Sequence, residues 1–71
     1  MIITPAQTEK LLSNNLTFSL LSFSMLVTRL KLVYEKDSSQ EKLQSCANEL
    51  TTFLNKYGAI MPKDCEAISK L

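Results

Sequence analysis

The chain has 71 residues, of which 45 % are hydrophobic and 21 % charged, and its formal net charge at pH 7 is +1. This length and composition predict one folded domain, residues 1–71, that is too apolar for disorder and small enough to need help from disulfides, a metal or another chain. The basic and acidic residues form no block of like charge, which argues against long-range attraction to nucleic acid or anionic lipid. Histidine is absent, so the commonest general base and the commonest metal ligand are both missing.

The first predicted helix covers residues 5–13. Thr4 precedes it as a candidate cap, a proline follows as the first helical residue, and Gln7 completes a capping box. The next residues, Ser-Asn-Asn at 13–15, have low helix propensity and predict a break. The alternative is a single helix over residues 5–35, about 45 Å long, which would be too long for a compact chain of this size.

Residues 16–27 read LTFSLLSFSMLV and carry no charge. A membrane span is disfavoured, because eight of the 18 uncharged residues from Leu11 to Thr28 are Ser, Asn or Thr, whereas a spanning helix needs about 20 predominantly apolar residues. A strand is disfavoured as well, because Leu26 interrupts the alternation and no partner strand is predicted elsewhere. The remaining possibility is a helix.

We therefore predict a central helix over residues 16–35. It has one apolar stripe at the helical period and a second stripe on nearly the opposite side. Because the helix is apolar around more than half of its circumference, neighbours should contact it from at least two directions. The first stripe is Leu12, Leu16, Leu20, Phe23, Val27, Leu30 and Tyr34, and the second is Phe18, Leu21, Met25 and Leu32.

The next predicted helix covers residues 39–57 and lies antiparallel to the central one across a short loop. A capping box formed by Ser38 with Glu41, or by Asp37 with Gln40, would start it, and Gly58 is the expected C-cap. Its single apolar stripe is Leu43, Cys46, Ala47, Leu50, Phe53, Leu54 and Tyr57.

A short last helix is predicted from residue 62 to residue 70. An ion pair between Glu66 and Lys70 would support it, and its inward-facing residues are Met61, Cys65, Ile68 and Leu71. The predicted fold class is therefore all-α, a small bundle of three or four helices with short helices at both ends.

No catalytic residue, cofactor, metal site or small-molecule ligand is indicated, and we expect no enzyme. Cys46 and Cys65 fall on buried stripes, where a thiol behaves as a small hydrophobic group, although a disulfide between them is a possible alternative. Two cysteines without histidine cannot complete a four-ligand zinc site, and no base is available to activate a cysteine nucleophile. A single glycine excludes a glycine-rich phosphate loop.

The second stripe of the central helix, Phe18, Leu21, Met25 and Leu32, is the candidate interface. Either the short terminal helices cover it, or a second copy or another protein does. We predict a non-catalytic protein–protein interaction module, most simply a two-fold homodimer. A cytoplasmic location is expected, because Glu9 and Lys10 replace the positive region of a signal peptide and no cleavage site follows.

Two other functions are weaker. A nucleic-acid-associated regulator would use the helix–glycine–helix pattern of residues 50–71, but Lys63 and Lys70 are the only cations of the last helix, so a basic surface would have to be assembled by oligomerisation. A peripheral membrane protein would use the Phe18–Leu32 stripe, but the polar face of this helix has few cations.

Overall fold

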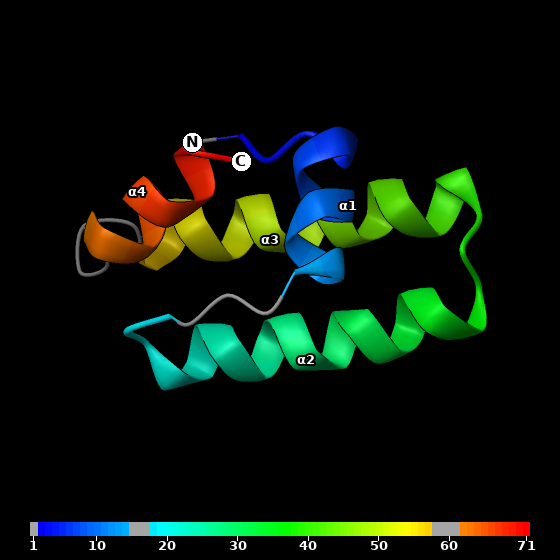
Figure 1. The fold of residues 1–71 in the computed structure, drawn as a ribbon, viewed down its shortest axis with the longest axis horizontal. Coiled ribbons are helices and arrows are strands. Elements are labelled where there is room, and N and C mark those ends of the chain that lie inside the picture. Colours follow the sequence, from blue (N-terminus) through cyan, green and yellow to red (C-terminus); the bar gives the residue numbers. More distant parts are fainter. Residues whose placement is uncertain (1, 15–17, 58–61) are drawn as a thin grey trace.

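The computed structural model describes residues 2–14, 18–57 and 62–71. Over these residues the chain forms no strand and four helices: α1 (Pro5–Ser13), α2 (Leu21–Lys36), α3 (Gln40–Tyr57) and α4 (Pro62–Ser69). Helices α2 and α3 run antiparallel along the long axis, α1 lies across both, and α4 lies beside the C-terminal half of α3 (Figure 1). The predicted all-α bundle is confirmed.

The start of α1 is the predicted capping box. The Thr4 side-chain oxygen accepts a hydrogen bond from the Gln7 backbone N–H at 3.1 Å, and the Gln7 side-chain oxygen accepts one from the Thr4 backbone N–H, also at 3.1 Å. Both N–H groups would otherwise lack a partner at the end of the helix. Local sequence is sufficient to start this helix where it starts.

The predicted break between the first two helices is confirmed, but the predicted start of the second helix at residue 16 is wrong. Helix α1 ends at Ser13, and α2 begins only at Leu21. Phe18, Ser19 and Leu20 belong to neither helix, and residues 15–17, which include Leu16 of the first predicted stripe, lie outside the described residues. The chain therefore forms two helices here instead of one long helix.

The late start of α2 has a tertiary cause, the carboxylate of Asp64 in the first turn of α4. It accepts hydrogen bonds from the backbone N–H groups of Ser19, at 2.6 Å, and Leu20, at 3.1 Å. Leu20, the N-cap residue of α2, provides no side-chain cap of its own. Asp64 is only 2 % exposed, and two charge-assisted hydrogen bonds compensate for removing its carboxylate from water.

The start of α3 differs from both predicted capping boxes. The hydroxyl of Ser39, not of Ser38, accepts the Lys42 backbone N–H at 3.2 Å, and an Asp37 carboxylate oxygen accepts the Ser39 N–H at 3.1 Å. Asp37 thus forms a local turn that places Ser39 as the cap, one residue later than the Ser38–Glu41 pairing and two later than the Asp37–Gln40 pairing. The predicted extent of the helix is correct to one residue, and the predicted C-cap Gly58 lies outside the described residues.

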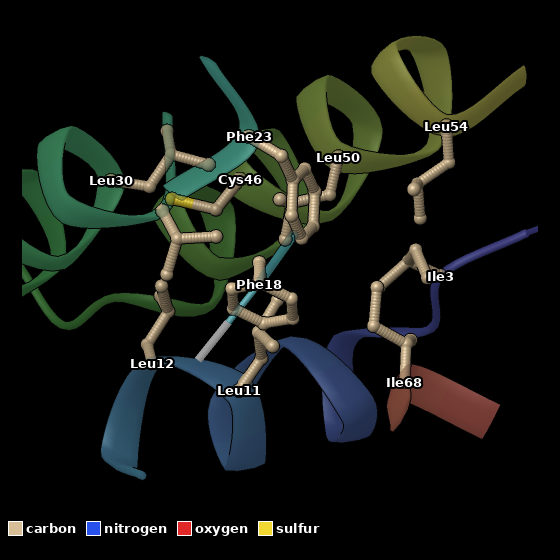
Figure 2. Packing of buried hydrophobic residues seen from close by; sticks show 11 residues of the cluster. Ile3, Leu11, Leu12, Phe18, Phe23, Leu30, Cys46, Leu50, Leu54 and Ile68 are labelled. Carbon is tan, nitrogen blue, oxygen red and sulfur yellow. The ribbon is translucent and has the colours of Figure 1, made fainter. Parts of the chain in front are cut away.

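Phe23 of α2 is at the centre of the core. It is fully buried, with its ring centroid 4.7 Å from that of Phe18 in an edge-on arrangement and 5.5 Å from that of Phe53. Figure 2 shows side chains from α1, α2, α3 and α4 converging on this region. The core consists of Ile3, Leu11, Leu12, Phe18, Phe23, Val27, Leu30, Cys46, Leu50, Leu54 and Ile68, with Leu20, Leu26, Tyr34, Phe53, Tyr57, Cys65 and Leu71 partly buried against it.

The described ends of the chain are held by polar contacts. The Ile3 backbone N–H donates to the Thr51 hydroxyl at 2.8 Å, and the Lys10 ammonium donates to the Leu71 carbonyl at 2.9 Å. In α4, Ile68 faces the core and the predicted Glu66–Lys70 ion pair is present at 3.2 Å, while Met61 lies outside the described residues. The first bond holds the residues before α1 against α3, and the second holds the residues after α4 against α1.

We expect Asp64→Ala to lower the free energy of unfolding by about 1–3 kcal/mol, because the part-buried backbone N–H groups of Ser19 and Leu20, directly before α2, lose their acceptors and a buried side chain is truncated. Asp64→Asn keeps one acceptor oxygen and should have a smaller effect. Urea denaturation followed by circular dichroism measures both changes.

Glu66→Ala is the matched control for this measurement. It removes a carboxylate from the same helix, but from an exposed ion pair whose loss should change the stability by no more than about 0.5 kcal/mol. Equal losses for Asp64→Ala and Glu66→Ala would contradict a role of Asp64 in holding α2.

Candidate interaction surface

The side of α2 that faces away from the core carries a row of apolar side chains. Leu21 is 72 % exposed, Met25 63 % and Leu32 57 %. Together with Thr28 they follow the helical spacing on the side opposite Phe23, and we call these four residues the outer face of α2. A shallow groove of about 440 Å³ lies on this face, lined by Leu21, Ser24, Met25, Thr28, Arg29 and Leu32.

Three of the four predicted interface residues are therefore together and exposed. The fourth, Phe18, is not on this face: it is 9 % exposed and packs edge-on against Phe23 in the core. Its assignment to the second stripe assumed that the helix began at residue 16, whereas Phe18 lies before α2 and its side chain belongs to the core. The terminal helices cover neither Leu21, Met25 nor Leu32.

Thr28 is the polar member of the outer face, and its polar atom already has a partner. The Thr28 hydroxyl donates a hydrogen bond to the Ser24 carbonyl one turn earlier, at 3.0 Å. This bond stays within the helix, so the hydroxyl needs no further donor or acceptor from a neighbouring molecule. The outer face can consequently be covered by an apolar surface without leaving that hydroxyl unpaired.

A second groove, of about 470 Å³, lies between α2 and α3 at residues that no sequence pattern had marked as a site. Its lining combines apolar, polar and charged residues: Leu26, Arg29, Asn48, Glu49, Thr52, Phe53, Lys56 and Tyr57. The Arg29 guanidinium pairs with the Glu49 carboxylate at 3.1 Å, and the Lys56 ammonium lies 5.3 Å from the Tyr57 ring centroid. No local pattern reveals such a groove, because its residues come from two helices. The position of Leu26 between the two stripes is the only sequence signal.

Arg29 borders both grooves and so marks the boundary between the outer face and the α2–α3 groove. Its pairing with Glu49 leaves both side chains about half exposed, and an exposed pair of this kind adds little stability. Its main consequence is electrostatic, since one of the cations beside the outer face is neutralised within the chain.

Both cysteines are thiols, as predicted, and no disulfide joins them. Cys46 is only 1 % exposed, and this burial raises the pKa of its thiol, with the nearby Glu49 carboxylate raising it further. A buried thiol with a raised pKa is a poor nucleophile, because the thiolate is the reactive form. Cys46 therefore serves as a core residue and offers no reactive centre.

Metal binding and membrane crossing can be checked over the part of the chain that the structure describes. No group of three or more Cys, Asp or Glu side chains lies close enough together there to hold a metal ion, and none of the described helices is long and apolar enough to cross a membrane. Comparisons of the chain with protein-family profiles, with curated proteins and with solved structures found no match. The surface itself is the remaining guide to function.

The two cysteines should differ in reactivity. At pH 8 we expect a thiol reagent such as iodoacetamide to modify native Cys46 at least tenfold more slowly than the partly exposed Cys65, because burial both shields Cys46 and raises its pKa. Peptide mapping by mass spectrometry gives the two rates from one sample. Denaturing urea should make the rates similar, and equal rates in the native protein would contradict the burial of Cys46.

Proposed function

We propose that this chain is a small non-catalytic helical module for protein–protein interaction, which associates through the outer face of α2 and most simply forms a homodimer. The observation that carries the proposal is the exposure of Leu21, Met25 and Leu32, between 57 % and 72 %, along a single side of one helix. The opposite side of the same helix is the core, where Phe23, Val27 and Leu30 are buried.

Single exposed leucines are ordinary on protein surfaces, so the support comes from their arrangement. One row along the helix contains Leu21, Met25 and Leu32. The polar residue in this row is Thr28, whose hydroxyl donates a hydrogen bond to the Ser24 carbonyl of the same helix. Contiguous apolar patches on small proteins are typical of interaction sites, because burying them in a complex releases about 25 cal/mol per Å² of apolar surface. A chain of this size also gains more from a second chain than a larger domain does.

A nucleic-acid-associated regulator, the alternative function, has less support. Of the acidic residues near the two cations of the last helix, Asp64 is used inside the chain to hold α2, and Glu66 pairs with Lys70. That pairing neutralises one of the two cations that such a surface would need. We expect the module to act in the cytoplasm, where reducing conditions keep both cysteines as thiols.

Met25→Glu should weaken self-association by at least tenfold in Kd, because a carboxylate would have to be buried against the apolar outer face of the partner. The fold should be unaffected, since Met25 lies outside the core. Sedimentation velocity over a concentration series measures the association, and circular dichroism checks the helix content.

Ser45→Glu, which adds the same charge to an exposed position of α3, is the matched control and should leave association unchanged. Two results would contradict the proposal of self-association through α2. One is a wild-type protein that stays monomeric over the whole concentration series, and the other is a dimer that Met25→Glu leaves intact.

A further inference from the structure

We propose that the outer face of α2 pairs with the same face of a second copy, antiparallel and about a two-fold axis. In this arrangement Leu21 packs against Leu32 of the partner subunit, and Met25 packs against Thr28 of the partner subunit. The inference rests on the proposed function. It specifies which molecule covers the outer face of α2, in which orientation and in which register.

The spacing of the outer face is the first argument. Its residues, 21, 25, 28 and 32, are separated by four, three and four positions, and this series reads the same in either direction. When two copies of α2 run antiparallel, every position of the row therefore meets a position of the partner's row at the same height. Leu21 and Leu32 are about 16 Å apart along the helix, so the two leucine contacts flank a central pair of Met25–Thr28 contacts. A two-fold interface requires such a self-complementary patch.

The distribution of charge along α2 is the second argument, and it selects the antiparallel orientation. Residues 21–28, LSFSMLVT, carry no charge, whereas residues 29–36 carry the cations Lys31 and Lys36 and the anion Glu35, a net charge of +1, besides Arg29, which is already paired with Glu49. A parallel pair would place the two cationic halves side by side. An antiparallel pair places each cationic half beside an uncharged half, and it also aligns the helix dipoles in the favourable, opposed direction.

The neighbouring groups are compatible with this packing. Arg29 is the cation nearest the centre of the row, and its guanidinium already pairs with Glu49 of the same chain at 3.1 Å. The Thr28 hydroxyl is bonded to the Ser24 carbonyl, so the methyl group of Thr28 is the part available to the partner's Met25. Closing the interface therefore leaves neither of these two polar groups without a partner.

The helix is long enough for the contact. Helix α2 has 16 residues and so extends over about 24 Å, along a molecule whose longest dimension is 31 Å. Figure 1 shows it along one edge, with α1 and α3 on its inner side and, among the described residues, no helix on the opposite side. A standard interface removes about 800 Å² from each partner, which is about one sixth of the 4608 Å² that this chain exposes.

Exchange of charge between the two leucine positions tests the orientation. Leu21→Glu and Leu32→Lys should each weaken self-association by at least tenfold, because each buries a charge against a leucine. Both positions are more than half exposed, and Glu and Lys are good helix formers, so both variants should fold like the wild-type chain. In an equimolar mixture of the two variants, the heterodimer should have a Kd within threefold of the wild-type value. The antiparallel heterodimer brings the introduced carboxylate against the introduced ammonium and keeps one wild-type leucine pair.

A matched mixture distinguishes the orientations. Leu21→Glu mixed with Leu21→Lys should give no recovery if the pairing is antiparallel, because neither charge then meets the other. Sedimentation equilibrium with one variant labelled by a fluorophore measures heterodimer formation in both mixtures.

The outcomes separate this inference from the proposed function. Recovery in the Leu21→Glu and Leu32→Lys mixture alone supports the antiparallel pairing. Recovery in the Leu21→Glu and Leu21→Lys mixture overturns the antiparallel register but leaves dimerisation through α2 standing. The same conclusion follows if the single variants are monomeric and neither mixture recovers. A monomeric wild-type protein overturns both the register and self-association, and it would leave the face to a different protein.

Discussion

The hydrogen bonds from the backbone of Ser19 and Leu20 to the buried Asp64 carboxylate determine where α2 begins. The two N–H groups belong to the N-cap residue, Leu20, and to the residue before it, so a side chain from α4 holds the backbone where the helix starts, although no local side chain caps it. The same contact joins segments that are 44 and 45 residues apart in the chain. It therefore connects the direction of α2 to the position of α4.

Two consequences follow for the surface. Phe18 lies before the helix and packs edge-on against Phe23, so its ring is part of the core and not of the outer row. Leu21, at the first position of α2, stays exposed together with Met25 and Leu32. The apolar side chains of this region are thus of two kinds: some are buried in the core, and the others form a narrow exposed row on α2. A small bundle that exposes such a row gains stability when a second molecule covers it.

In the dimer that we propose, few residues of the outer face would specify the pairing. Apolar contact alone would not distinguish parallel from antiparallel pairing, because Leu21, Met25 and Leu32 could meet their own copies or each other. In the proposed dimer the cations Lys31 and Lys36, both in the second half of α2, would distinguish the two arrangements electrostatically. Arg29 also links this face to the groove beside α3, through its pairing with Glu49.

The sequence by itself determined the parts of this protein that depend on neighbouring residues. The Thr4–Gln7 capping box, the apolar stripe of α3 and the Glu66–Lys70 pair could be predicted, because each arises within three or four residues along one helix. Only the tertiary structure decided the start of α2, the burial of Phe18 and the α2–α3 groove. Each of these depends on a contact between residues far apart in the chain, and periodicity along one helix carries no information about such a contact.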